Sequence, residues 1–322
     1  MLLIKKIFSS AYLNATKAKL RVICYHRVNR GHDYFSIDTD VFEKQIEYLA
    51  KHYSIIPFQE FFNVLEGRKD IRKGLLITFD DGYHDFYSDA FPILEKYSAP
   101  AVVFLTTNFI NQKMWMWQDL YRFIFYKTQL RSFNLHFNGN ESISIKSNPE
   151  KMNARKIIHE HCVLLGREER IDFLQNLAKE LRVSLPETPP DKYAAMNWDE
   201  VRELSGRNIE FGAHTHKHEI LSCLNHQDIQ SEVSESKRII EKNLNKPITA
   251  FAYPNGSKQD YSDEAKSIVK ENGFKCAFTM VRGLNDQTTD KFELKRFSNP
   301  RNFDRTFNSQ LSGINQAFTN TN

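Results

Sequence analysis

The chain has 322 residues, of which 41% are hydrophobic and 26% charged, and its formal net charge is +4. This is an ordinary globular composition, and the length suits a single α/β barrel that carries an insertion. The small net charge gives no case for a nucleic-acid partner. The four cysteines form no Cys-x-x-Cys pair, so we interpret them as buried free thiols in a reducing compartment rather than as a disulfide framework.

The first 19 residues contain a short apolar run that Ser9, Ser10 and Asn14 interrupt. A secretory signal peptide needs a longer apolar core, so we predict none, and the chain has no apolar stretch of transmembrane length. We therefore expect a cytoplasmic protein that either stays free of the membrane or lies at its inner face. Residues 1–19 would make that peripheral contact as a membrane-surface helix, and a helix packed on the domain is the simpler alternative.

Strands and helices alternate over the first third of the sequence. The predicted strands cover residues 20–28, 54–57, 75–79 and 101–106, and the predicted helices cover residues 41–53, 59–67 and 85–97. Asp38 or Thr39 is suited to cap the first of these helices. Such alternation is typical of an α/β protein with a parallel sheet.

The alternation of strands and helices breaks off between residues 111 and 193. We interpret these residues as an insertion, either a lid or a side subdomain, within one domain of residues 1–322. It begins with aromatic residues between Trp115 and Tyr126, which suit either sugar stacking or a hydrophobic core. Alternating apolar residues and an Asn138-Gly139-Asn140 turn then predict a β-hairpin. The predicted helices of the insertion cover residues 149–165 and 168–181.

Strands and helices alternate again after the insertion. Further strands are predicted at residues 209–213, 248–253, 276–280 and 292–297, and further helices at residues 199–205, 227–244, 263–272 and 303–318.

The stretch from Leu75 to Gly82 runs from apolar residues directly into Asp80 and Asp81. It has no polar alternation, which predicts a strand buried on both faces of a parallel sheet. Active sites of α/β sheets and barrels lie at the carboxyl ends of such strands. Two carboxylates buried there would be costly unless other groups offset their desolvation. The alternative is a solvated Asp-Asp-Gly turn.

His214 and His218 follow the predicted strand of residues 209–213 and stand four positions apart. On one helical turn or in a tight loop, this spacing directs two imidazoles at one point. The pair alone is weak evidence, since solvated surface histidines have the same spacing. With a carboxylate from another strand end, however, two histidines form a three-ligand set typical of a catalytic metal. His216 points elsewhere, so we assign it to the surface or to a supporting role.

Three short motifs resemble those of the polysaccharide deacetylases, carbohydrate esterase family 4, which carry a NodB-homology domain. Thr78-Phe79-Asp80-Asp81-Gly82 resembles the first motif, His214-Thr215-x-x-His218 the second, and Phe251 to Gly256 a variant of the third. The resemblance implies a distorted (β/α) barrel of about seven parallel strands. It also implies hydrolysis of N-acetyl groups on an amino-sugar-containing glycan or glycan precursor. The implied cofactor is one divalent metal ion, zinc first, with cobalt, nickel or iron as alternatives.

The resemblance also implies roles for individual residues. Asp81, His214 and His218 would bind the metal, and Asp80 would be the general base. This division is physically reasonable, because one carboxylate is taken up by the metal and the other stays free to accept a proton. The loop of Tyr253, Pro254, Asn255 and Gly256 would meet the substrate, with backbone N–H groups after Pro254 holding the oxyanion.

Two features depart from the family pattern. The arginine that often begins the third motif is replaced by Ala252, and the Leu-x-x-His that often supplies the general acid is not visible near the C-terminus. We expect Arg296 to replace the missing arginine and His26 to act as the general acid, since leaving-group protonation needs a donor near neutral pKa. A similar Tyr-His element lies early in the variant branch that resembles poly-N-acetylglucosamine deacetylases. The alternatives are a solvated arginine and a capped strand-end histidine.

These residues together favour a metal-dependent N-deacetylase. Two other functions stay open at this point: a catalytically inactive carbohydrate-binding barrel that keeps the metal site, and a metal-dependent amidase acting on a non-sugar amide. The intact Asp80 argues against the inactive barrel, because a binding protein needs no free base.

Overall fold

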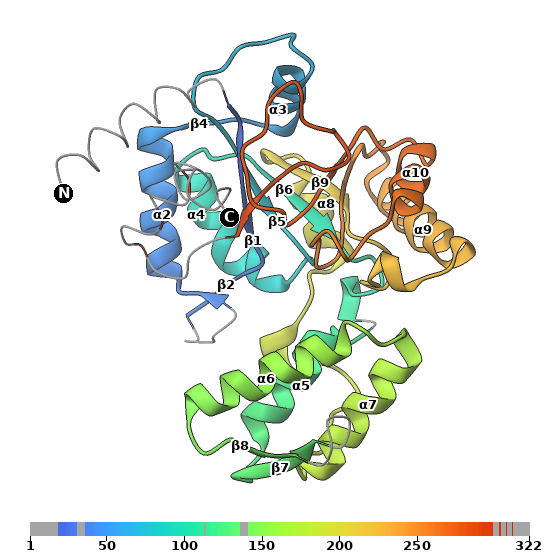
Figure 1. The fold of residues 1–322 in the computed structure, drawn as a ribbon. Coiled ribbons are helices and arrows are strands. Elements are labelled where there is room, and N and C mark those ends of the chain that lie inside the picture. The colour runs from blue at the N-terminus through green and yellow to red at the C-terminus, as the bar shows by residue number, and fades with distance from the viewer. Residues whose placement is uncertain are drawn as a thin grey trace, which may run out of the picture.

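The structure is a computed structural model that describes residues 19–30, 36–112, 114–135 and 141–298 and the single positions 303, 307 and 311. A curled sheet surrounded by helices forms the larger part, and a smaller group of helices and strands lies beneath it in Figure 1. Nearly all of residues 1–19 and most of residues 303–318 lie outside the described residues, so the helices predicted there stay predictions. Within the described part of the chain, no helix is long and apolar enough to cross a membrane.

The central sheet is entirely parallel. Its strand order is β11-β10-β9-β6-β5-β1-β12, and β4 pairs with β5 beside this path. The bounds of its strands are β1 (Arg21–Tyr25), β4 (Ser54–Ile55), β5 (Gly74–Phe79), β6 (Ala101–Leu105), β9 (Ile209–Ala213), β10 (Ala250–Ala252), β11 (Cys276–Phe278) and β12 (Phe297–Ser298).

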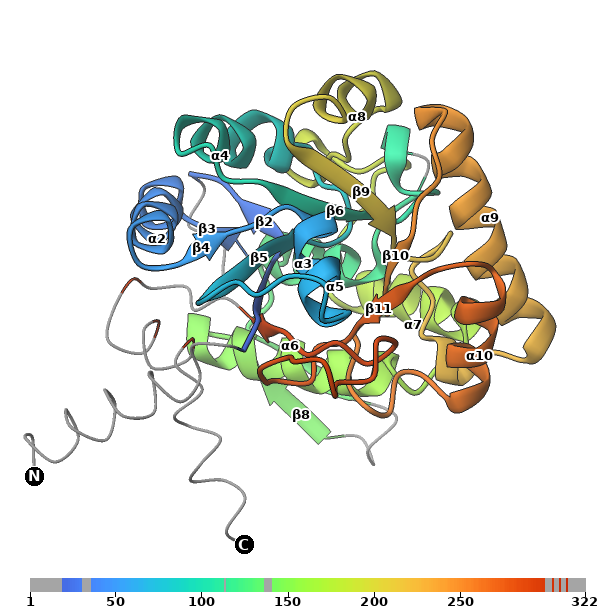
Figure 2. The same cartoon turned by 90° about the horizontal axis from the view of Figure 1, so that it is seen from above.

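The last described strand brings the two edges of the sheet together. Leu294 forms a parallel bridge with Phe278 in β11, and three residues later Phe297 pairs with Ile23 in β1. Figure 2 shows the strands curling around a common axis, with α3 (Phe58–Leu65) over one end. The predicted distorted (β/α) barrel is therefore confirmed.

The strands are buried on both faces, as their uninterrupted apolar runs predict. One face forms the barrel interior, where Phe104 of β6 and Phe278 of β11 approach with ring centroids 5.3 Å apart. Phe61 of α3 packs on Phe278 from the end of the barrel. The other face, which includes Ile77 and Val103, packs against the surrounding helices. Since α3 fills one end, the strand ends that face the insertion are the ones open to a site.

The surrounding helices follow the predicted order. They are α2 (Thr39–His52), α4 (Phe91–Lys96), α8 (Trp198–Leu204), α9 (His226–Leu244) and α10 (Asp263–Glu271). Asp38 caps α2 by accepting the backbone N–H of Asp40 at 2.9 Å. The predicted helix of residues 85–97 is a π-helix over Phe86–Ala90 followed by α4, because Pro92 has no N–H to continue the regular bonding.

The insertion lies at the end of the barrel where the parallel strands terminate (Figure 1). It contains α5 (Trp117–Lys127), α6 (Asn148–Cys162), α7 (Arg167–Glu180) and the strands β7 (Ser132–Leu135) and β8 (Glu141–Ser144). The two strands pair antiparallel, as the predicted hairpin requires, and the predicted Asn138-Gly139-Asn140 turn lies outside the described residues. A short parallel pair, β2 (Arg27–Val28) and β3 (Ser36–Ile37), lies beside the barrel end.

Most of the aromatic patch of the insertion, including Trp117, Tyr121 and Phe125, belongs to a separate hydrophobic core between α5, α6 and α7, whereas Tyr126 is exposed. Trp117 is 5% exposed. One face of its ring stacks on His159 with centroids 5.4 Å apart, and the guanidinium of Arg170 lies 5.0 Å from the ring centroid. Trp117 is therefore covered by its own neighbours, which favours the core interpretation over sugar stacking.

The four cysteines are free, as predicted, and Cys24, Cys162 and Cys276 are buried. Cys223 is exposed, which corrects the expectation that all four are buried. It ends a short 3-10 turn, Leu221–Cys223, in which Leu221 fills the core position.

Candidate active site

The carboxyl ends of β1, β5, β9 and β10 surround a cavity of about 410 Å³. It is lined by both the barrel and the insertion. The barrel provides His26, Arg27, Asp80, Asp81, Tyr83, His214, His218, Asn255 and Met280, among others, and the insertion provides Gln118, Arg122 and His159.

Asp81, His214 and His218 form a compact, buried cluster in this cavity. The Oδ1 atom of Asp81 lies 3.2 Å from Nε2 of His218 and 3.6 Å from Nε2 of His214. The backbone fixes this convergence, since the N–H of His214 donates to Leu105 and the carbonyl of Asp81 accepts from Thr106. β6 thus holds the two strand ends side by side.

The three donor atoms fit a divalent cation. Nδ1 of His214 lies 2.8 Å from the carbonyl oxygen of Ala252, so it carries the proton and Nε2 presents its lone pair toward Asp81. Burial lowers the pKa of His214 to about 4, which leaves the imidazole neutral at neutral pH. Asp81 Oδ1 is buried and accepts no well-directed hydrogen bond from the described residues. Two imidazole nitrogens and one carboxylate oxygen are a zinc-type ligand set.

Asp80 does not join this cluster but forms an ion pair with Arg296. The guanidinium donates to both carboxylate oxygens, at 2.7 Å and 2.8 Å, and both side chains are buried. Burial by itself would raise the pKa of Asp80, but the positive charge and the hydrogen bonds of Arg296 outweigh it and hold the pKa below its usual value. Asp80 therefore stays ionised in the cavity.

Cys24 and His26 also converge on Asp80. The thiol of Cys24 donates to Asp80 Oδ2 at 3.4 Å, and Nε2 of His26 lies 4.0 Å from the same oxygen. A second cation at this position would meet the positive charge of Arg296, so Asp81, His214 and His218 are the better site. The side chain of His26 is 44% exposed and lines the same cavity.

The third-motif loop differs in part from its predicted role. Tyr253 is fully buried, its ring stacks on Tyr261 at 4.3 Å, and its hydroxyl donates to the carbonyl of Phe292. Successive residues of a strand point to opposite faces, so Ala252 faces the barrel interior and Tyr253 faces the outer core. Tyr253 is therefore not one of the described residues that line the cavity.

Only one backbone N–H group of this loop is a candidate donor to an oxyanion. The N–H of Gly256 donates to the carbonyl of Pro254 at 2.6 Å, so it is engaged within the turn. Asn255 lines the cavity, and its N–H has no hydrogen-bond acceptor in the described part of the chain. Pro254, which is buried, has no N–H and fixes the turn.

Several residues of the site have left-handed backbone conformations, in which a side chain is strained. They are Asp81 (φ 79°), Thr215 (φ 64°), His218 (φ 60°) and Asn255 (φ 57°). Gly82 has φ 94°, and a Cβ at that position would approach the side chains of Leu105 and Ile110 to 2.9 Å. The turn after the two carboxylates therefore requires glycine, whereas the other four residues keep strained conformations that direct the site.

The insertion contributes residues that the sequence patterns did not reveal. Tyr83, two positions after Asp81, donates to Asp119 Oδ2 of α5 at 2.6 Å, and Arg122 donates to Asp119 Oδ1 at 2.9 Å. The bond from Tyr83 ties α5 to the loop that carries the carboxylates, and Arg122 fixes Asp119 from within α5. No signal could have identified them, because the motifs lie outside the insertion.

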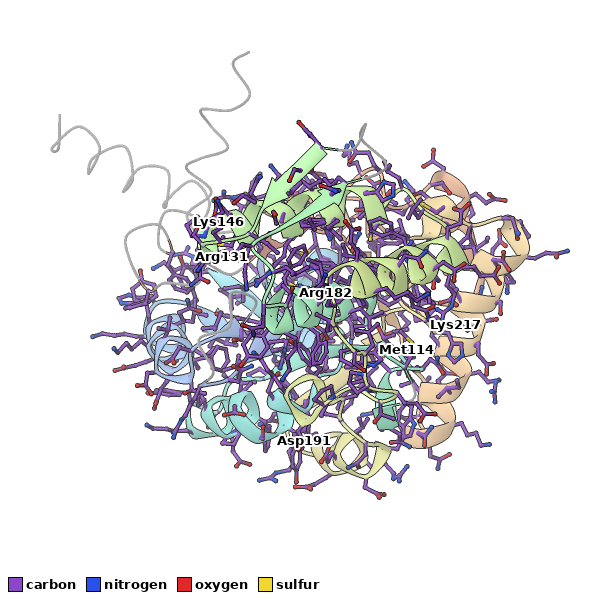
Figure 3. All side chains as sticks on the ribbon, turned by 90° about the horizontal axis from the view of Figure 1, so that it is seen from below. Met114, Arg131, Lys146, Arg182, Asp191 and Lys217 are labelled. Atoms are coloured by element: carbon purple, nitrogen blue, oxygen red, sulfur yellow. The ribbon has the colours of Figure 1, made fainter. Side chains whose placement is uncertain are left out.

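A second cavity of about 350 Å³ lies between the insertion and the loop after β9. Trp115 and Trp117 line this cavity and not the one that contains the two carboxylates. Met114 and Lys217, which are labelled in Figure 3, also belong to its lining.

Comparisons with known proteins agree with this architecture. Residues 67–134 and 189–277 match the family model described as polysaccharide deacetylase, and the gap between them falls within the insertion. The Bacillus subtilis (strain 168) protein YxkH is 22% identical over 291 residues, which are 89% of this chain and 74% of that protein.

A relative with a named substrate is the poly-beta-1,6-N-acetyl-D-glucosamine N-deacetylase of Staphylococcus aureus (strain MRSA252). It is 28% identical over 187 residues, and the match spans 55% of this chain and 60% of the relative's length. Among solved structures, the Streptococcus pyogenes deacetylase PplD in complex with acetate superimposes with a TM-score of 0.62 at 18% identity. The superposition covers 92% of this chain and 99% of PplD.

Proposed function

The chain belongs to the polysaccharide deacetylase family, and we propose that it is a metal-dependent N-deacetylase of an amino-sugar-containing glycan or glycan precursor. The observation that carries this proposal is that two adjacent carboxylates have different partners. Asp81 faces two histidine nitrogens, whereas Asp80 is held by Arg296 within the same cavity. One carboxylate is thus suited to bind a cation and the other to accept a proton.

Asp81, His214 and His218 would hold the cation, with zinc as the first choice and cobalt, nickel or iron as alternatives. When bound, a divalent ion polarises a carbonyl oxygen and lowers the pKa of a neighbouring water. The remaining chemistry belongs to the side chains of the cavity.

Asp80 accepts a proton from the attacking water, while Arg296 keeps the carboxylate ionised and oriented. The water oxygen attacks the acetamide carbonyl carbon, and the N–H of Asn255 stabilises the negative charge that develops on the carbonyl oxygen. His26 donates a proton to the sugar nitrogen as the C–N bond breaks. The products are acetate and a free amine on the glycan.

A substrate screen tests the proposal. Protein reconstituted with zinc, cobalt or nickel is incubated with β-1,6-linked and other N-acetylated oligosaccharides, with N-acetylated sugar nucleotides and with N-acetylated peptides. We expect acetate and new primary amine in equal amounts from at least one sugar substrate. Glycan binding without acetate release would instead identify an inactive binding barrel, and release from the peptides alone would identify an amidase.

His26→Ala tests the proposed general acid. We expect kcat to fall by about 10²–10³-fold, within the range for a positioned proton donor, because water can partly replace a half-exposed side chain. The alkaline limb of the kcat/KM profile should flatten while metal content stays that of the native protein. His84→Ala, which removes a histidine outside the cavity lining, is the control and should leave the profile unchanged. An unaltered alkaline limb in His26→Ala would exclude His26 as the donor.

Arg296→Gln tests the partner of the base. Arg296 favours the ionised carboxylate, so its removal lets burial raise the pKa of Asp80. The acid limb of kcat/KM should therefore move to higher pH, measured at saturating metal and below the melting temperature of the variant. Arg296→Lys retains a positive charge and should keep the acid limb near its native position. If both variants lose stability but neither moves the acid limb, the role of Arg296 is structural only.

A further inference from the structure

Gln118, at the start of α5, reaches from the insertion to the metal-ligand cluster. Its Nε2 atom lies 3.4 Å from Nδ1 of His218. Its Oε1 atom is buried and has no hydrogen-bond partner in the described part of the chain. The side-chain amide of Gln118 thus lies beside the imidazole of His218, and the amide oxygen has no partner among the described residues.

The chemistry of a ligating histidine decides which amide atom belongs at this imidazole. Nε2 of His218 faces Asp81, so Nε2 must offer its lone pair to a cation and Nδ1 must carry the proton. An Nδ1–H group needs an acceptor. His214 has the carbonyl of Ala252, and Gln118 is the group that the described residues place at Nδ1 of His218. A half-turn of the amide exchanges its two atoms and brings Oε1 to Nδ1.

We propose that Gln118 is a positioning residue for His218, and that the insertion thereby completes the cation site of the barrel. Oε1 of Gln118 accepts the Nδ1–H of His218 and fixes the tautomer that binds a cation through Nε2. The same bond gives the buried Oε1 its partner. This inference rests on the proposed metal dependence and extends it to a segment outside the family motifs.

The contacts of the neighbouring residue show why Gln118 is well placed for this role. Asp119 is fully buried and accepts from the hydroxyl of Tyr83, so the first turn of α5 is fixed to the loop that carries Asp81. The contacts that hold Gln118 therefore also hold the loop of the cation ligand Asp81. Docking of the insertion and cation affinity should change together.

The test measures the dissociation constant for Zn²⁺ and Co²⁺ by competition with a chelator, without substrate. We expect Gln118→Leu, which has no acceptor, to bind 10–100-fold more weakly, the usual effect of removing the partner of a ligating histidine. Gln118→Glu keeps an acceptor and should stay within about threefold of the native affinity, a smaller change than the loss of the partner causes. Gln129→Leu is the matched control, since Gln129 is exposed just beyond the far end of the same helix and should not affect the affinity.

A spectroscopic measurement gives a second readout. In the Co²⁺ protein, the Nδ1–H protons of both histidines should give shifted, solvent-exchangeable NMR signals, and the His218 signal should exchange faster in Gln118→Leu. If that variant does not fold, Gln118→Asn, whose amide falls one methylene short of the ring, replaces it with the same expectation. Native affinity in Gln118→Leu or Gln118→Asn would overturn the inference, and so would equal losses of affinity in Gln118→Leu and Gln118→Glu. A native protein that binds neither metal would instead overturn the proposed function.

Discussion

Asp80→Asn is expected to keep its metal and to lose turnover by about 10⁴-fold, the upper end of the range for a positioned acid–base group. Asparagine cannot accept the proton of the attacking water, whereas the ligands Asp81, His214 and His218 are untouched. The measurement is kcat for acetate release together with the metal content of the same preparation.

The substitution also leaves Arg296 buried without its counter-charge. We expect the free energy of unfolding to fall by about 3–5 kcal/mol, the usual effect of removing one partner of a buried ion pair. Activity must therefore be measured well below the melting temperature of the variant, with circular dichroism as the control for folding. Acetate release at the native rate would remove Asp80 from the mechanism.

The double substitution His214→Ala, His218→Ala should abolish both metal binding and activity. Elemental analysis of the native protein should give about one metal ion per chain, and the variant should contain almost none, because a single carboxylate is a weak site. His216→Ala is the matched control from the same loop. The ring of His216 contacts Thr107, and His216 is absent from the described cavity lining, so its loss should leave the metal content unchanged. A native protein that purifies without metal and takes up none of zinc, cobalt or nickel would contradict the assignment.

The sequence predicted the parts of the site that depend on local patterns. The unbroken apolar run before Asp80 marks a strand buried on both faces, and that strand is β5. The spacing of His214 and His218 predicted their convergence, which the loop after β9 produces through left-handed residues rather than through a helix. Arg296 followed from the absence of arginine at position 252, and the structure places it on Asp80.

The parts that escaped prediction depend on orientation or on distant contacts. Tyr253 lies in the motif, but strand alternation turns its side chain into the outer core. Gln118 stands 100 residues from His218, and nothing in its neighbourhood indicates that the two meet. The aromatic residues around Trp117 have the composition of a sugar-binding surface, yet the two helices that cover them come from later in the chain.

The pairing of Arg296 with Asp80 spans 216 residues, and Arg296 directly precedes β12, the strand that pairs with β1. During synthesis the carboxylate therefore leaves the ribosome long before its guanidinium partner. Until that segment docks, the first-made strands can associate, but a buried Asp80 would lack the charge that offsets its desolvation. The barrel thus cannot close stably around its base before the segment that carries Arg296 has been made, so the strands that surround the site must wait for a partner that follows them in the chain by more than two hundred residues.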